Sequence, residues 1–141
     1  MRIQLGCGAL VALCLSWTAL AQAPSPMREG NWELSTKIMM AGMPVEAPPM
    51  KQTMCVTAEM LRNPAEAMSK IPGSDCKVTD YKLQGSTATY KMMCTQPAPI
   101  SAVGEMKYAG SDAYTGTVTI DMGGQNMTLS TDAKRIGDCA K

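Results

Sequence analysis

The sequence predicts a mainly β protein: an antiparallel β meander that forms a curved sheet or open barrel, with a short helical insertion and disulfide staples. Three observations lead to this fold class. Apolar and polar residues alternate along much of the chain, as in half-buried strands. Turn signals recur about every ten residues, which favours strands joined by hairpins. Four cysteines remain after a predicted export signal, and exported chains usually pair their cysteines.

Residues 1–21 are predicted to be a signal peptide. Arg2 precedes an apolar run, and residues 19–21 (Ala-Leu-Ala) have the small residues of a cleavage site. We expect cleavage after this site, a short flexible leader over residues 22–29 and one β-rich domain over residues 30–141. No later run approaches the roughly 20 apolar residues of a membrane-spanning helix. The mature chain is therefore expected to be periplasmic or secreted, without a transmembrane segment.

The composition indicates which class of partner is disfavoured and which residues form the core. Lys and Arg total 13 and Asp and Glu 12, with no block of either sign, which disfavours nucleic acid as a partner. Beyond the predicted signal the chain has only 14 Leu, Ile and Val residues and no Phe, but 13 methionines. Met is flexible and fills irregular gaps. We therefore expect many methionines to lie in an adaptable core.

The first half of the predicted domain contains two strands and the helical insertion. Alternation over residues 30–40 predicts the first strand, with Trp32, Leu34, Thr36, Ile38 and Met40 on one face. A Pro- and Gly-containing loop follows at residues 41–49, and a second strand at residues 50–57.

The helical insertion has two predicted start signals. Thr57 can cap a helical turn that begins at Ala58. Asn63 and Pro64 have the pattern of a second N-cap followed by proline at the first helical position. The second helical piece is expected to end before Pro72.

The second half of the domain is strand-like throughout. The predicted strands cover residues 76–84, 87–94, 101–109, 113–122 and 125–139. Gly85 and Ser86 form a hairpin signal between the first two. Tyr114, Val118, Ile120 and Met122 share the inward face of the fourth. Gly116 falls on that face and leaves a gap, which predicts a bulge or a close backbone approach.

Strand directions suggest how Cys55, Cys76, Cys94 and Cys139 pair. A simple meander places Cys76 and Cys94 at one end of the sheet and Cys139 at the other, and Cys55 joins Cys139 if the helical insertion acts as a crossover. Cys76–Cys94 and Cys55–Cys139 follow. A two-residue loop at the hairpin would put Cys76 and Cys94 on opposite faces, so this pairing needs an odd loop or a bulge. Without a crossover, Cys55 and Cys76 become neighbours and the pairing changes.

The order of several short motifs resembles a known family. The chain has a secretory signal, "GNWELSTKI", a "GMP…PP" loop, "CVTAE", a hairpin that ends in the third mature cysteine, "AYTG" and a closing "KRIGDC". This order resembles the exported bacterial family known as domain of unknown function 3617, over residues 30–139. The resemblance implies a small periplasmic or secreted β-rich domain and carries over no catalytic residue.

Enzymatic activity is not expected. The chain has no histidine, its cysteines are expected to be paired, and no nucleophile motif stands in a suitable context. Six carboxylates are candidates for general acid–base catalysis: Glu33, Asp80, Glu105, Asp112, Asp121 and Asp132. They occur singly at strand-surface or turn positions, where solvated charge is the usual role. We therefore predict no catalytic residue and no cofactor.

The expected role is non-enzymatic binding or structural support in the cell envelope, with an unidentified envelope partner or a small apolar ligand. One alternative is Cu(I) binding, because Cu(I) accepts thioether ligands. Its candidate ligands are Met39, Met40, Met43, Met50, Met92 and Met93. The other alternative is a lipid or peptide on the concave face of the sheet, with the loop over residues 41–49 as a rim.

Overall fold

The chain forms one seven-stranded, wholly antiparallel sheet with strand order β2-β1-β7-β6-β5-β4-β3. The computed structural model describes residues 25–42, 48–70 and 73–140. The predicted signal peptide, residues 1–21, and Met43 lie outside these ranges. The elements are β1 (Gly30–Met40), β2 (Met50–Val56), α1 (Ala58–Arg62), α2 (Pro64–Ser69), β3 (Asp75–Gln84), β4 (Thr87–Gln96), β5 (Ile100–Tyr108), β6 (Ala113–Asp121) and β7 (Asn126–Gly137). The predicted fold class, a mainly β curved sheet with a short helical insertion, is confirmed.

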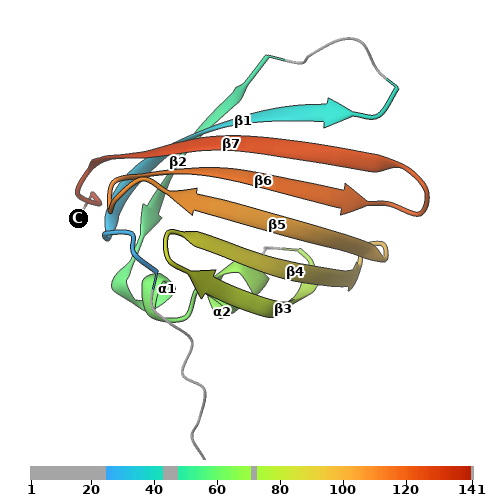
Figure 1. Ribbon diagram of the computed structural model, residues 1–141, viewed down its shortest axis with the longest axis horizontal. Coiled ribbons are helices and arrows are strands. Elements are labelled where there is room, and N and C mark those ends of the chain that lie inside the picture. Colours follow the sequence, from blue (N-terminus) through green and yellow to red (C-terminus); the bar gives the residue numbers. More distant parts are fainter. Residues whose placement is uncertain (1–24, 43–47, 71–72, 141) are drawn as a thin grey trace, which may run out of the picture.

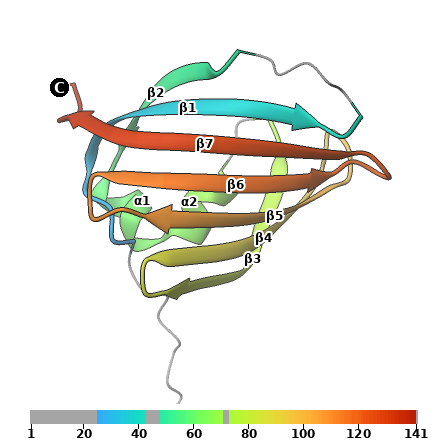
Figure 2. The ribbon, with the colours of Figure 1, turned by 45° about the horizontal axis from the view of Figure 1, so that its top comes forward.

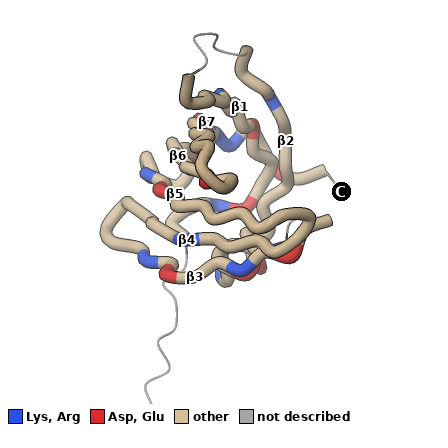
Figure 3. The backbone as a smooth tube through the Cα atoms, turned by 90° about the vertical axis from the view of Figure 1, so that its right-hand side faces the viewer, with Lys and Arg blue, Asp and Glu red and all other residues tan. Residues whose placement is uncertain are grey.

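The sheet is curved and open, because β2 and β3 are its two edges and do not pair with each other. Figures 1 and 2 show the two short helices against the inner face, near the end of the sheet where β1 begins. Figure 3 looks at the sheet from its other end and shows the strands following one another in an arc. Basic and acidic residues alternate around this arc without forming a block of one sign.

The buried core lies where helices and sheet meet. Its main cluster consists of Trp32, Leu34, Val56 and Ala133, and Trp32 is fully buried. Other buried apolar residues come from β3, β4 and β5: Cys76, Ala88, Tyr90, Ala102 and Tyr108. Trp32 and Leu34 are inward-facing residues of β1, as the alternation predicted. The indole N–H of Trp32 donates to the Arg28 carbonyl oxygen at 3.1 Å, which satisfies the one polar group that its burial would otherwise leave unpaired.

The helical insertion begins as predicted. The Thr57 side chain accepts a hydrogen bond from the Met60 backbone N–H, so Thr57 caps α1. α2 starts at Pro64, but Asn63 makes no side-chain capping bond, since its backbone (φ −128°, ψ 66°) also ends α1. Only the position of the predicted second cap is therefore right. The insertion carries the chain from one end of the sheet to the other, and thus acts as the crossover.

Both predicted disulfides are confirmed: Cys55–Cys139 and Cys76–Cys94. The hairpin between β3 and β4 has a two-residue loop, since Gln84 pairs with Thr87. The register then shifts between Thr79 and Lys82, where Asp80 has φ 53°. This is the bulge that the pairing required, and it brings Cys76 directly opposite Cys94.

Residues 25–29, the described part of the predicted leader, have fixed partners. The Ser25 N–H donates to the Leu61 carbonyl oxygen at 3.1 Å and the Arg28 N–H to the Ser111 carbonyl oxygen at 3.0 Å. The Arg28 guanidinium also pairs with the Asp112 carboxylate at 2.6 Å. This segment therefore ties α1 to the turn between β5 and β6, and it closes the same end of the inner face that the helices cover.

Candidate functional site

An apolar pocket of about 120 Å³ lies between the helices and the inner face of the sheet. Five of its lining residues are methionines, and each comes from a different part of the fold: Met27 from the N-terminal segment, Met54 from β2, Met60 from α1, Met68 from α2 and Met106 from β5. Tyr108, Tyr114, Ser25 and smaller apolar residues complete the wall, and none of the described side chains that line it is charged. We call it the methionine pocket.

Local structure explains why these methionines meet. Met54 lies opposite Trp32 in the β1–β2 pair, and Met106 lies opposite Gly116 in the β5–β6 pair, so both face inward. The Thr57 cap holds the first turn of α1, which contains Met60. Unbranched thioether side chains can adapt to the shape of whatever they surround. The pocket wall is therefore both apolar and adjustable.

Aromatic rings form the rigid side of the methionine pocket. The rings of Trp32 and Tyr114 lie 5.9 Å apart, and those of Tyr108 and Tyr114 lie 6.0 Å apart, edge to face. The Tyr108 hydroxyl points to Met106 Sδ at 4.0 Å. Burial, and then the neighbouring Tyr108 and Tyr90, raise the pKa of Tyr114 to about 12. The phenol is therefore neutral at physiological pH.

A second apolar region lies at the other end of the inner face. It contains Ile38, Met40, Val118, Ile120, Met127 and Leu129, and we call it the open patch. The strand register places Ile38, Leu129 and Val118 in one row across the sheet. Met40, Met127 and Ile120 form the next row. The helices lie against the opposite end of this face (Figure 2). The patch residues are half-buried or, in the case of Met40, 45% exposed.

Gly116 separates the methionine pocket from the open patch. The predicted bulge or close backbone approach at this residue is wrong, because the registers of β6 with β5 and β7 run through it without a shift. A Cβ at Gly116 would meet nothing nearer than Tyr114 Cε2 at 3.7 Å. Close contact occurs instead at Gly104, where a Cβ would lie 2.2 Å from the Tyr90 ring. Gly104 is therefore required by packing, and Gly116 is not.

The family model described as "Protein of unknown function (DUF3617)" matches residues 27–139. The chain belongs to this family. The comparisons with curated proteins and with solved structures found no match. The resemblance predicted from the order of motifs is thus confirmed, and membership in DUF3617 assigns no activity. Among the residues that the structure describes, no helix is long and apolar enough to span a membrane.

The methionines proposed as Cu(I) ligands do not gather in one place. Met39 and Met40 are consecutive in β1 and face opposite sides of the sheet. Met50 begins β2, opposite Thr36. Met92 and Met93 belong to β4, which three strands separate from β1. None of these described candidates lines the methionine pocket. No pattern in the sequence singles out the pocket methionines, since they come from segments far apart in the chain.

Four of the six candidate carboxylates lie apart, on the surface or in turns, and the other two, Glu33 and Asp132, share one hollow. Asp80 pairs with Lys91 at 3.3 Å, Glu105 with Lys107 at 3.0 Å, and Glu33 with Lys134 at 3.4 Å. Asp112 binds Arg28, as described above. Asp121 accepts the Gly123 N–H at 2.9 Å within a turn. Asp132 and Glu33 line the same hollow, which also contains Lys51 and Lys134. These are the two candidates that the structure brings together, and the Glu33 carboxylate is paired there with the Lys134 ammonium.

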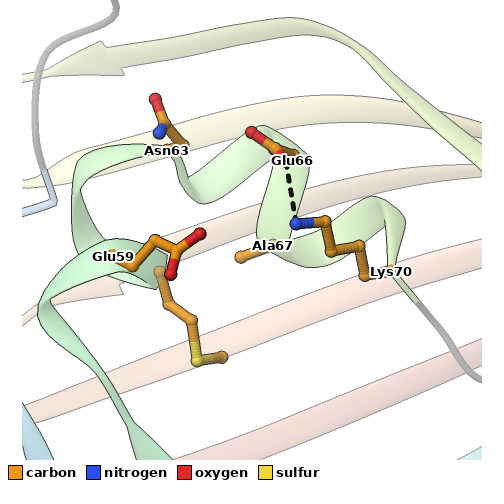
Figure 4. Close-up of a pocket in the computed structure, with 6 residues that line it drawn as sticks. Glu59, Asn63, Glu66, Ala67 and Lys70 are labelled. Atoms are coloured by element: carbon orange, nitrogen blue, oxygen red, sulfur yellow. Dashed lines mark ion pairs between the residues drawn. The ribbon is translucent and has the colours of Figure 1, made fainter.

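A polar hollow of about 160 Å³ lies on the helices (Figure 4). Its charged groups are Glu59, Glu66 and Lys70, and the Lys70 ammonium pairs with the Glu66 carboxylate at 2.8 Å. The hydrogen bond and charge of Glu66 raise the pKa of the Lys70 ammonium. Both partners are largely exposed, so this is an ordinary pair one helical turn apart. The methionine pocket is the stronger candidate for a binding site.

Proposed function

We propose that this DUF3617 protein is a non-enzymatic binding protein of the cell envelope that holds a small, neutral, apolar ligand in the methionine pocket. The observation that carries the proposal is the convergence of five methionines, from five segments of the chain, on one pocket in which none of the described lining residues is charged. Met-rich walls are typical of sites that accept varied apolar partners. The two disulfides are compatible with a periplasmic or extracellular location.

The size of the methionine pocket limits what it can hold. Pockets for drug-sized ligands occupy roughly 300–1,000 Å³, whereas an engineered apolar cavity of roughly 150 Å³ binds benzene. The methionine pocket, a hollow of about 120 Å³ that is open to solvent, therefore accepts one small apolar group or the end of a longer apolar molecule. Each methylene group of a ligand that is buried in the pocket contributes about 0.8 kcal/mol to the free energy of binding.

The same pocket supports a neutral ligand better than Cu(I). Five thioethers suit Cu(I) by ligand softness. A cation, however, would enter an apolar cavity without an acidic lining residue, and burial of an unpaired charge is unfavourable. Titration of the purified chain with Cu(I) against a chromophoric chelator tests this choice. We expect no competition with the chelator, and tight binding that is lost when Met60 and Met68 are changed to Leu would favour the metal.

One aromatic ring of the neutral dye N-phenylnaphthylamine is of the size that the methionine pocket accepts, so binding of the dye, followed by fluorescence, tests the proposal itself. Leu61→Trp puts a larger side chain into the wall of the methionine pocket and should weaken dye binding at least tenfold. Arg62→Trp adds the same side chain at the exposed neighbouring position of α1 and is the matched control. Met68→Ala should enlarge the methionine pocket, so the variant should accept bulkier dyes. Its free energy of unfolding should be lower by about 2 kcal/mol. Equal dye binding by wild type and a folded Leu61→Trp variant would overturn the proposal.

A further inference from the structure

We propose that the ligand of the methionine pocket is an unbranched acyl chain, and that Gly116 determines the chain length that the protein accepts. This inference rests on the proposed function and names the ligand class of the same site. In this arrangement the end of the chain occupies the methionine pocket, the middle passes over Gly116, and the remainder lies on the open patch.

The position of Gly116 supports a passage between the two regions. The inward-facing residues of β6 follow one another as Tyr114, Gly116, Val118 and Ile120. Tyr114 lines the methionine pocket, whereas Val118 and Ile120 belong to the open patch. Between them, Gly116 provides no side chain. Along β6 the path from Tyr114 to Val118 is about 13 Å, the length of four residues of an extended strand, and at Gly116 it is bordered by Met106 on one side and Thr131 on the other.

Nothing in the fold requires a glycine at this position. The backbone of Gly116 is not in the left-handed region, and the nearest atoms to a Cβ built there are Tyr114 Cε2 at 3.7 Å, the Glu105 carbonyl oxygen at 3.8 Å and Met106 Cγ at 3.8 Å. These are ordinary van der Waals contacts. Glycine inside a strand is unfavourable and often marks a site where a ligand approaches closely. An acyl chain that passes over the sheet accounts for its presence.

The polar groups along this path favour an acyl chain over a peptide. A peptide has one N–H and one C=O per residue, and both need partners when buried. Under the path, β7 and β6 are hydrogen-bonded on both sides and β1 is so up to Thr36, so these backbones offer a buried peptide no partners; beyond Thr36 β1 is paired with β7 alone. The Thr36 and Thr131 hydroxyls, in the same row as Gly116, are 2.9 Å apart and bond each other. A hydrocarbon chain has no polar group to satisfy, and its width suits the small pocket.

Displacement of N-phenylnaphthylamine by a homologous series of unbranched fatty acids, from hexanoate to hexadecanoate, tests the inference. In wild type, affinity should rise about fourfold per added methylene until the pocket and the open patch are filled. Gly116→Val blocks the passage with a residue that strands accept well. The affinity of this variant for the shortest acids should match that of wild type. Its affinity should stop rising with chain length once the methionine pocket is full. Lysophosphatidylcholines of the same chain lengths show whether a bulky head group is tolerated.

Three further results complete the test. Thr117→Val changes the adjacent, exposed residue on the outer face and should leave the whole series unchanged. If the affinity of a folded Gly116→Val variant rises with chain length as it does in wild type, the inference is overturned. Dye binding would in that case still support the proposed function. A dimer that dissociates on Ile120→Ser, without any effect of chain length, would also overturn it and assign the open patch to a second copy. Absence of dye binding in wild type would instead remove the proposed function itself.

Discussion

The two ends of the inner face share one strand pattern but differ in what covers them. At one end, Trp32, Leu34 and Tyr108 lie under the helices and the N-terminal segment and are less than 10% exposed. At the other end, Ile38 and Met40 continue the same alternation in β1, yet Met40 is 45% exposed. Alternation therefore identifies the inward face of a strand, and the insertion between β2 and β3 decides which part of that face becomes core.

The difference extends to the kind of side chain at each end. The covered end has aromatic rings in fixed contact with one another, whereas the open patch has only aliphatic and thioether side chains. Rigid rings suit a core that must specify one structure, while flexible side chains suit a surface that accommodates a ligand. The methionine pocket lies at the boundary and combines both. We expect substitutions at the covered end to affect stability and those at the open end to affect binding.

Removal of the tryptophan ring should have the largest effect on stability. Trp32 is fully buried and its indole N–H is hydrogen-bonded, so Trp32→Ala should lower the free energy of unfolding by about 3–5 kcal/mol. Ile38→Ala, in the same strand but in the open patch, should cost about 1 kcal/mol, because its side chain is only half-buried. Urea unfolding followed by circular dichroism measures both. Equal losses would show that the open patch is part of the core in solution.

Two inward-facing glycines in neighbouring rows, Gly104 level with Val118 and Gly116 level with Thr131, should also differ, with a smaller effect. Gly104→Ala places a methyl group 2.2 Å from the Tyr90 ring and should cost about 1–3 kcal/mol. Gly116→Ala meets only ordinary contacts and removes the entropic cost of glycine, so it should be neutral or stabilising by up to about 1 kcal/mol. The difference between the two melting temperatures is the measurement. A comparable loss at Gly116 would contradict the gap that the structure shows there.

Most of the fold could be predicted from the sequence, because its signals are local. Period-two alternation identified the strands, and the Thr57 cap and Pro64 placed the helices. The cysteine pairing required one further step, the direction of each strand. A two-residue hairpin loop is compatible with facing cysteines only if the hairpin contains a bulge. The sequence therefore indicated that a bulge exists but not where it lies. Asp80 supplies it with φ 53°, a conformation that Asp adopts more readily than most residues.

The candidate site could not be predicted in this way. Neighbouring methionines in the sequence point to residues 37–50, where Met39 faces the opposite side of the sheet from Met40 and Met50. The pocket methionines lie between residues 27 and 106 and meet only after the insertion folds back on the sheet. The sequence indicates that Gly116 leaves a gap in the inward face of its strand. It does not show that packing requires Gly104 but not Gly116, because both are inward-facing glycines. The distinction depends on which ring lies above each, and that is a tertiary contact.

Alkaline titration should show the smallest difference between the two ends. Tyr114 lies at the covered end, whereas Tyr90 lies in the same row of the sheet as Val118 of the open patch. Burial, followed by Tyr108 and Tyr90, raises the pKa of Tyr114 to about 12 from about 10 in an unfolded chain. Below pH 10 the phenol is protonated in both states, so it contributes no pH dependence. Above pH 10 the unfolded state loses the proton first, and stability falls as the pH rises through 12.

The size of this effect can be measured with one variant. For Tyr114 the loss should reach about 1 kcal/mol by pH 11. Tyr114→Phe removes this titration but leaves those of Tyr81 and Tyr90, whose pKa values burial also raises. The variant should therefore lose less stability than wild type between pH 9 and 11, in urea unfolding at each pH. Parallel losses in both proteins would mean that the Tyr114 hydroxyl reaches solvent, and that the covered end is as open as the patch beyond Gly116.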